Sequence, residues 1–427
     1  MNTRKHFIPA SLTAAIALAS GLAAATGTGA SETGATATGN NEHKSIAAAI
    51  KGGSAKLEFR LRHEEVDVDN TSQDEARGLT LRTRLNYTTG LYQGFGATIE
   101  MDNITEIDGN DYPTSPALKN SGNFPGKSII ADPTGTEINQ AYLSYSYGST
   151  IGKYGRQRIN LDNQRFIGGV GFRQNEQTFD AVSLAHTFTA ADTKVYYAHI
   201  NNVNRIFGED DPALSDTDSS TELFNINYSG FKTGELVFYS YLLDEEQSDT
   251  QYDTYGLRFN GKTNGVGYQL EYATQDREMA SGNKMDADYI LLEGSVDLAA
   301  ATFTLGFENL QSDNGNYGFS TPLATGHKFQ GWTDQFLNTP NEGIEDIYLS
   351  IGAKFNGVKL LAVYHDFKAD VENSVGDDDL GSELGLLALK QCGDYTVSFK
   401  YASYEAGDSS FSKSDTDKFW LTVSGAF

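Results

Sequence analysis

The sequence predicts an all-β fold: a closed antiparallel transmembrane β-barrel of about 18 strands. Apolar and polar residues alternate with a period of two along almost the whole chain, as in strands with one apolar and one wet face. Short turns alternate with long polar loops, which is typical of bacterial outer-membrane barrels. A closed sheet also has no edges, and hydrocarbon does not tolerate the unpaired backbone groups of an edge.

The first 30 residues predict a secretory signal peptide. Arg4 and Lys5 form a basic start, an apolar run follows at 12–22, and small residues continue to Ala30. The apolar run is too short to be a spanning helix. We expect cleavage near Ala25 or Ala30 and export of the mature chain.

The composition of the remaining chain excludes several classes of protein. No run of 18 or more apolar residues follows the signal, which excludes a helical membrane protein. The single cysteine, Cys392, excludes an intramolecular disulfide. Residues 31–53 are expected to form a flexible N-terminal segment, because 31–44 are rich in Gly, Thr, Ser and Ala. Residues 54–427 are expected to form the barrel.

The alternation is clearest in the first predicted strand. There, Leu57, Phe59 and Leu61 alternate with Arg60 and Arg62. The predicted strands span residues 54–66, 77–88, 93–103, 137–147, 149–161, 176–188, 192–202, 221–230, 234–244, 252–261, 265–276, 286–297, 301–311, 344–355, 358–368, 381–390, 394–404 and 415–427.

Every second connection between these strands is very short. The turn at 356–357 is Asn-Gly, the strongest short signal for a hairpin. The long polar connections lie at 104–136, 203–220, 312–343, 369–380 and 405–414. We expect the long loops to be extracellular and both termini to be periplasmic. The last strand ends on Phe427, which resembles the assembly signal of outer-membrane barrels.

Arginine is unevenly distributed in this acidic chain. Nine of the 13 arginines lie between Arg60 and Arg173, although the net charge is -25. On the predicted strands they are out of phase with the apolar residues, so they should point into the lumen. A lipid-facing arginine near the bilayer midplane would cost about 2–4 kcal/mol. The predicted pore-lining and substrate-binding residues are Arg60, Arg62, Arg82, Arg84, Arg156, Arg158, Arg165 and Arg173.

Two interpretations of this cluster remain open, and they do not exclude each other. In the first, the arginines form ion pairs along the wall. The predicted acidic partners in the lumen are Glu58, Glu100, Asp102 and Asp162. In the second, the arginines form a constriction that selects anions, helped by the glycine-rich loop that carries Arg165 and Arg173. A planar guanidinium suits carboxylates because it can bind them through two parallel hydrogen bonds.

The acidic residues are concentrated in the predicted loops, at 209–218, 244–253 and 375–379. The plain interpretation is a solvated surface. The functional alternative is that divalent cations bridge these loops to lipopolysaccharide. No other cofactor is expected.

Three stretches go beyond the generic barrel pattern. They are EINQAYLSY…YGRQRINLDNQRFIGGVGFRQNEQTFDAVSL at 137–184, NNVNRIFGED at 201–210 and PLATGHKFQGWTDQFLNTPNEGIEDIYLSIG at 322–352. They resemble the alginate-export family of outer-membrane β-barrel proteins, and the likeness runs from about residue 54 to 427. The resemblance implies an 18-stranded barrel with an arginine-lined pore that passes a polyuronate. The arginine-bearing block of the family is matched at Arg156, Arg158 and Arg165.

These observations predict a porin-like channel in the outer membrane that passes anionic or saccharide solutes of the uronate type. Dedicated export of alginate or another exopolysaccharide is one alternative. An outer-membrane lipase or protease and an adhesin are others, but the sequence has no G-x-S-x-G and no H-E-x-x-H motif, so we expect no enzyme. The expected partners are outer-membrane lipid and lipopolysaccharide, the barrel-assembly machinery and the solute; no nucleic acid is expected.

Overall fold

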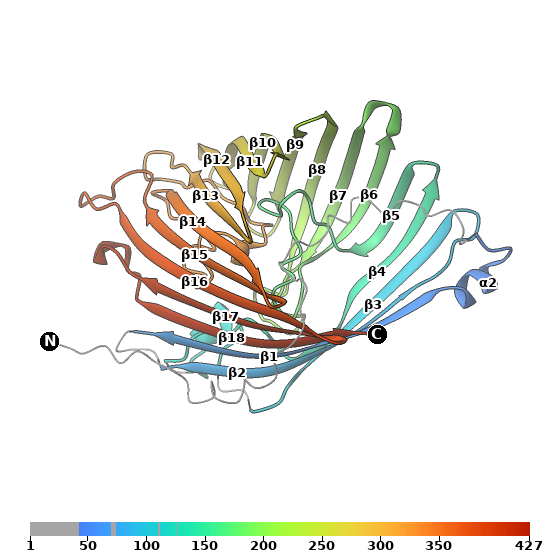
Figure 1. The fold of residues 1–427 in the computed structure, drawn as a ribbon, viewed down its shortest axis with the longest axis horizontal. Helices are drawn as coiled ribbons and strands as arrows, with labels where there is room; N and C mark the ends of the chain where they lie inside the picture. The colour runs from blue at the N-terminus through green and yellow to red at the C-terminus, as the bar shows by residue number, and fades with distance from the viewer. Residues whose placement is uncertain (1–41, 70–73, 110–111, 125) are drawn as a thin grey trace.

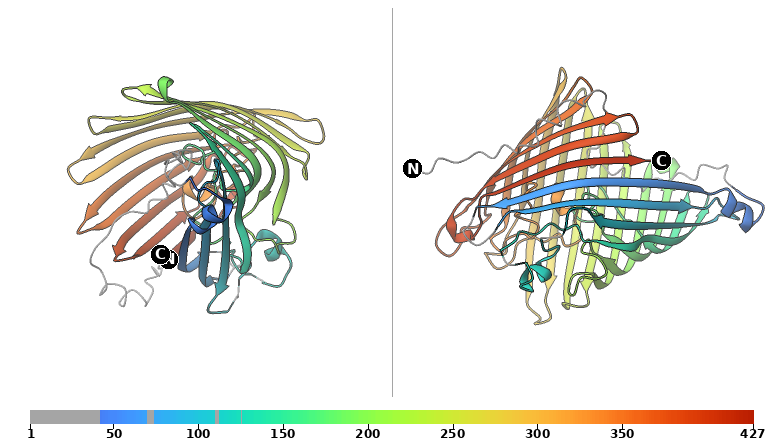
Figure 2. Two further views of the ribbon diagram at one scale, coloured as in Figure 1. Left: turned by 90° about the vertical axis from the view of Figure 1, so that its right-hand side faces the viewer. Right: turned by 90° about the horizontal axis from the view of Figure 1, so that it is seen from below.

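The protein is a closed barrel of 18 antiparallel strands, seen in a computed structural model that describes residues 42–427 except 70–73, 110–111 and 125 (Figure 1). The predicted signal peptide lies outside the described residues. Each strand pairs with the next one in the sequence, and β1 pairs with β18 to close the sheet. The two views of Figure 2 show the strands wrapping around a central space. The predicted fold class is confirmed.

The strands have the following bounds: β1 Ser54–Val68, β2 Ala76–Thr88, β3 Phe95–Glu106, β4 Gly135–Tyr147, β5 Thr150–Gln157, β6 Thr178–Phe188, β7 Thr193–Asn204, β8 Asp216–Phe231, β9 Gly234–Glu245, β10 Thr250–Thr263, β11 Val266–Glu278, β12 Lys284–Leu298, β13 Ala301–Leu310, β14 Ile344–Phe355, β15 Val358–Lys368, β16 Asp379–Cys392, β17 Tyr395–Glu405 and β18 Thr416–Ala426.

All 18 predicted segments coincide with strands, and the largest difference at an end is at β8, which begins at Asp216 and not at residue 221. A second difference lies in the functional region. We predicted that the fifth strand continues to residue 161, but β5 ends at Gln157. The chain leaves the wall there and enters the lumen, with Asp162, Gln164 and Val170 in the left-handed backbone region. Arg158 is therefore the first residue of a loop and does not belong to a strand.

The side chains of the strands alternate between a lipid-facing outer surface and the lumen. In β10, Tyr255 and Leu257 are exposed, whereas Thr254 and Arg258 are buried. An apolar outer face with a polar inner face is the arrangement found in outer-membrane barrels. This alternation is why the period of two appeared in the sequence.

Of the segment 31–53 that was expected to be flexible, residues 31–41 lie outside the described residues, and the end of the segment contains helix α2 (Ile46–Lys51). Its Ser45 cap accepts a hydrogen bond from the backbone N–H of Ala48 at 3.2 Å, and the helix is rich in alanine. The hydroxyl of Tyr87 in β2 donates to the carbonyl oxygen of Ile50, which ties the helix to the rim of the barrel. No helix in the described part of the chain is long and apolar enough to cross a membrane.

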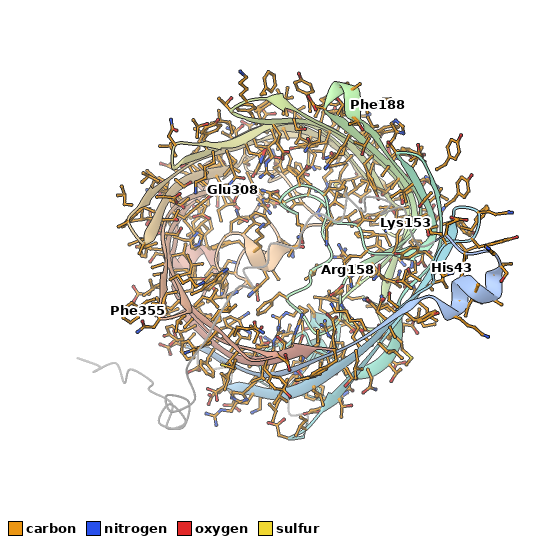
Figure 3. All side chains as sticks on the ribbon, turned by 45° about the vertical axis from the view of Figure 1, so that its right-hand side comes forward. His43, Lys153, Arg158, Phe188, Glu308 and Phe355 are labelled. Atoms are coloured by element: carbon orange, nitrogen blue, oxygen red, sulfur yellow. The ribbon has the colours of Figure 1, made fainter. Side chains whose placement is uncertain are left out.

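The described parts of three long connections contribute buried side chains and cavity-lining residues inside the barrel. They belong to 107–134, which carries helix α3 (Pro116–Asn120), to 158–177, and to 311–343, which carries the short helix η3 (Gly326–Lys328). We call 158–177 the first luminal loop and 311–343 the second luminal loop. Figure 3 shows Arg158 and the short helix inside the ring of strands. The connections expected at 104–136 and 312–343 thus fill the lumen instead of projecting only outward.

Candidate functional site

The first luminal loop crosses the lumen because its sequence permits close packing. Gly168 has no side chain, and a Cβ atom there would lie 2.2 Å from the hydroxyl oxygen of Thr325 in the second luminal loop. The apolar side chains of Phe166 and Ile167 are buried inside the barrel against Tyr239 and Tyr289 of the wall. The loop therefore has an apolar core of its own within a polar lumen.

Arginines of β1 and β2 hold this loop through its backbone. Arg60 Nη1 donates to the carbonyl oxygens of residues 171–173 at 3.1, 3.1 and 3.0 Å. Arg62 donates to the carbonyl oxygen of Phe172, and Arg82 donates to that of Gln174 at 3.2 Å. These guanidinium groups satisfy loop carbonyls that would otherwise be buried without a donor.

Glu176, near the end of the first luminal loop, lies within ion-pair distance of three arginines. Its carboxylate lies 2.5 Å from Arg158, 2.7 Å from Arg84 and 3.8 Å from Arg82. Burial alone would raise the pKa of Glu176, but the three guanidinium groups outweigh burial and hold the pKa well below its usual range. Glu176 is therefore ionised and ties the first luminal loop to the wall.

Two of the predicted acidic partners belong to the same network. Glu100 forms an ion pair with Arg158 at 2.8 Å, and Asp102 forms one with Arg84 at 2.5 Å. Both carboxylates are on β3 and are almost completely buried.

The other two predicted acids are paired differently. Glu58 forms its ion pair with Lys56 of the same strand, at 2.5 Å. Asp162 accepts hydrogen bonds from Asn225 at 2.8 Å and from the hydroxyl of Tyr241 at 3.3 Å. Asp162 sits on the part of the first luminal loop that faces the β8–β9 side of the wall, away from the arginines of β1 and β2.

The remaining two loop arginines pair with acids on different strands of the wall. Arg165 forms an ion pair with Glu308 of β13 at 2.8 Å. Arg173 pairs with Glu64 of β1 at 2.8 Å and with Asp334 of the second luminal loop at 3.3 Å. The first luminal loop is thus attached by charge on both sides of the barrel.

Arg156 is separate from the rest of the cluster. It pairs with Asp180 at 2.9 Å and Glu209 at 3.4 Å, beside a cavity of about 150 Å³. The structure gathers Arg60, Arg62, Arg82, Arg84, Arg158 and Arg173 around one loop, and it sets Arg156 and Arg165 elsewhere. Seven of the eight have a carboxylate partner, as the interpretation as ion pairs expects, whereas Arg60 donates to backbone carbonyl oxygens.

Most of the acidic partners were not singled out from the sequence. The missed partners are Glu64, Asp132, Glu176, Asp180, Glu209, Glu308 and Asp334. Glu64 had a usable signal, because it shares the luminal side of the first strand with Arg62. Within the described ranges, no three His, Cys, Asp or Glu side chains are arranged to hold a metal ion.

The two luminal loops are hydrogen-bonded to each other. The N–H of Gly168 donates to the carbonyl oxygen of Leu323 at 2.9 Å, and the N–H of Thr325 donates to that of Gln164 at 3.1 Å. Gln177 Nε2 also donates to the carbonyl oxygen of Leu323, at 3.2 Å. These contacts form a partition across the lumen.

The partition separates two cavities. The larger, about 860 Å³, is lined by the strand ends that lead into long loops, such as Val68 and Thr416, and we call it the loop-side cavity. The smaller, about 370 Å³, is lined by strand ends next to the short turns, such as Lys194 and Asn260, and we call it the turn-side cavity.

His327 connects the second luminal loop to the wall. Its Nδ1 lies 2.6 Å from Asp334, its Nε2 lies 2.7 Å from the ammonium of Lys400 in β17, and its ring stacks on Phe172. An ammonium can only donate, so Nε2 accepts and the imidazole is neutral. Burial lowers the pKa of His327 to about 3, in agreement with a neutral ring.

The comparisons with known proteins agree with this architecture. The family model described as Alginate export matches residues 57–306. Crystal structures of Pseudomonas aeruginosa OccD3 (OpdP) and Acinetobacter baumannii OccAB4 each share 14% identity with this chain, with TM-scores of 0.66 and 0.67. The alignments cover 89% of this chain and 92% of the first, and 88% of this chain and 98% of the second. At this identity the likeness shows a shared fold. No curated protein matches the sequence.

Proposed function

The chain belongs to the Alginate export family, and from this premise we propose that it is an outer-membrane channel for small anionic or saccharide solutes of the uronate type. The observation that carries the proposal is the polar lumen with its two cavities of about 370 and 860 Å³, one on each side of the partition. Cavities of this size accommodate single small molecules. We propose no catalytic role.

Export of a polymer is the competing function, suggested by the name of the family. Both luminal loops cross the path, and they are joined to each other and to opposite walls by hydrogen bonds and ion pairs. A polysaccharide would need the whole partition to be displaced for as long as the chain is threading. A single sugar needs only a brief local opening, so the partition favours small solutes.

The arginine cluster has a different role in this proposal from the one first expected. Its members are paired with carboxylates and loop carbonyls, and they set the position of the first luminal loop. We propose that they shape the constriction, and that selection for anions comes from basic groups that face the cavities.

The test is conductance of the purified protein in planar bilayers, combined with swelling of proteoliposomes in glucuronate, glucose and uronate oligomers of increasing length. We expect ion conduction and uptake of glucuronate, with a cutoff at short oligomers. Absence of conduction would contradict a channel of any kind. Uptake that continues to long oligomers would favour polymer export over the proposed function.

A further inference from the structure

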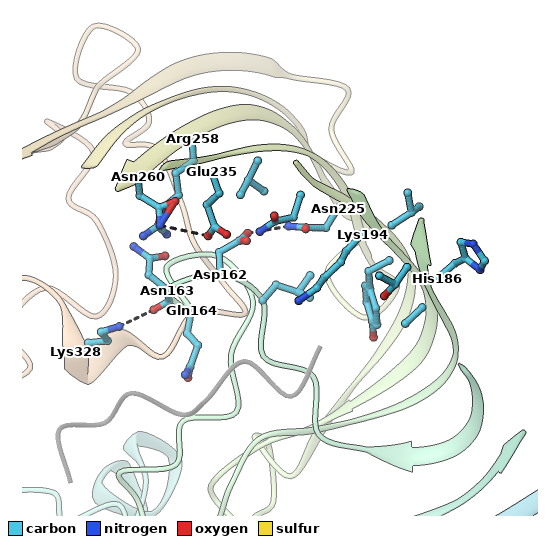
Figure 4. Close-up of a pocket in the computed structure, with 17 residues that line it drawn as sticks. Asp162, Asn163, Gln164, His186, Lys194, Asn225, Glu235, Arg258, Asn260 and Lys328 are labelled. Carbon is cyan, nitrogen blue, oxygen red and sulfur yellow. Dashed lines mark hydrogen bonds between the residues drawn. The ribbon is translucent and has the colours of Figure 1, made fainter. Parts of the chain in front are cut away.

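The turn-side cavity is lined by basic, amide and acidic side chains from the wall strands β6 to β10 and from the two luminal loops. Figure 4 shows Arg258 and Asn260 on the wall, Asn163 on the first luminal loop and Lys328 beside it on the second. Strand β10 contributes Arg258 and Asn260, and η3 contributes Lys328. None of these basic residues belongs to the arginine cluster that holds the first luminal loop.

Arg258 is buried like most of the clustered arginines, but two of its buried nitrogens lack a hydrogen-bond partner among the described residues, whereas Arg62 and Arg82 each leave only a buried Nε without one. The Arg258 side chain is 5% exposed, and Nη2 donates to Gln269. Nε and Nη1 have no hydrogen-bond partner among the described residues, and the ion-pair contact of Nη1 with Glu271 is long, at 3.9 Å. Leaving a buried charged donor without an acceptor is unfavourable. Arg258 lines the turn-side cavity, but these two nitrogens are closed off from it, so a solute carboxylate would pair with them only after the Arg258 side chain moves toward it.

Lys328 supplies a second positive charge on the other side of the cavity. Its ammonium uses one donor on the carbonyl oxygen of Asn163, at 2.8 Å, and an ammonium has three donors. Two acids also line the cavity: Asp162 accepts from Asn225, and Glu235 accepts from Asn260 at 3.3 Å. A carboxylate has about four acceptor positions, so both acids keep capacity for hydroxyl donors.

Resting on the proposed function, we propose that the turn-side cavity is a binding site for one sugar-acid unit. Arg258 and Lys328 bind the carboxylate, and Asp162 and Glu235 accept hydrogen bonds from the sugar hydroxyls. A site that carries both basic groups and hydroxyl acceptors distinguishes a hydroxylated acid from a neutral sugar and from a simple anion. The volume of about 370 Å³ suits a monosaccharide better than a chain.

The experiment uses the full-length channel in planar bilayers and measures block of the KCl current by glucuronate, with glucose and acetate as comparison solutes. The variants are Arg258→Gln, Lys328→Gln and the control Arg77→Gln. Arg77 is an exposed arginine at the end of the barrel that carries the long loops, and it pairs with Glu75 at 2.8 Å. The control removes the same charge without touching the cavity.

We expect Arg258→Gln and Lys328→Gln each to raise the glucuronate dissociation constant about tenfold or more, because a hydrogen bond to a charged group contributes about 1.5–3 kcal/mol. Arg77→Gln should leave that constant unchanged, and glucose and acetate should bind more weakly than glucuronate in the wild type. Lys328 is exposed on a loop, so its variant tests the site even if Arg258→Gln assembles poorly.

The outcomes separate the two proposals. Glucuronate block that is equal in the wild type and both cavity variants would overturn the binding site and leave the channel intact. A wild-type protein that does not conduct would contradict the proposed function itself. Equal affinity for acetate and glucuronate would also overturn the site, because its acids would then bind no hydroxyl.

Discussion

Replacing Glu176 by Gln tests whether the arginine cluster holds the first luminal loop. The change keeps the size of the side chain and removes the one charge shared by three guanidinium groups. The Glu176 carboxylate lies 2.5 Å from Arg158, 2.7 Å from Arg84 and 3.8 Å from Arg82. If the cluster is an attachment, its loss should release the loop and leave the barrel wall intact.

The expected size of the effect follows from burial. Removing one partner from a buried ion pair costs about 3–5 kcal/mol. Arg84 keeps Asp102 and Arg158 keeps Glu100, so the lower end, about 3 kcal/mol, applies here. Each 1.4 kcal/mol is a factor of ten, so the ratio of attached to released loop should fall about 100-fold.

Single-channel recording measures this change directly. We expect Glu176→Gln to show frequent excursions to a higher conductance, while the wild type and the exposed-site control Glu75→Gln remain steady. Heat-modifiable gel mobility should be the same for all three proteins, because no strand pairing depends on Glu176. If Glu176→Gln keeps the conductance and the current noise of the wild type and changes only the ion selectivity, the attachment is refuted. The cluster would then act only through the electrostatic potential that it creates in the lumen.

Three further predictions concern other parts of the barrel. Burial holds the pKa of His327 at about 3, below its ordinary 6.5, so the attached second luminal loop prefers the neutral ring. Attachment of this loop should therefore weaken as pH falls from about 6.5 toward 3. Current noise should rise over that pH range in the wild type, and it should not depend on pH in His327→Gln. Gly155 has φ +123°, and a Cβ there would lie 2.4 Å from a carbonyl oxygen of β4, so Gly155→Ala should lower the yield of folded barrel on heat-modifiable gels, whereas Gly152→Ala, with 3.7 Å of room, should not. An epitope inserted at Asp377 should bind antibody on intact cells, and one at 356–357 should require permeabilised cells; the reverse result would invert the topology.

The wall of the barrel was predictable because its determinants are local. The outward-facing residues of a strand are apolar whatever the distant sequence is, so the period of two appears in each strand separately. Turn length is local in the same way, and the Asn-Gly at 356–357 connects β14 to β15 as predicted. Helix α2 was missed because its six residues are short and are held by contacts to the barrel rim, such as that of Tyr87.

The contents of the lumen were less predictable because they depend on residues far apart in the sequence. The side on which Arg60 and Arg62 lie followed from strand parity, but the loop carbonyls that they contact lie more than 100 residues away. Arg165 and Glu308 are 143 residues apart and meet only because the first luminal loop crosses the barrel. Arg258 gave no signal, since an isolated arginine on a strand does not show in the sequence whether its donors are satisfied.

The pairing of β1 with β18 has a consequence for the order of folding. The N–H of Leu57 donates to the carbonyl oxygen of Phe427 at 2.9 Å, and the reverse hydrogen bond is 2.8 Å. This pairing joins the first and the last strand of the described sheet. The sequence separation between its paired residues is therefore much larger than in any hairpin of the wall, and contacts of large sequence separation form late in folding. Until this pairing forms, both strands present open edges that can pair with other chains. A chain shortened by β18 should therefore aggregate as an open sheet and not close as a smaller pore.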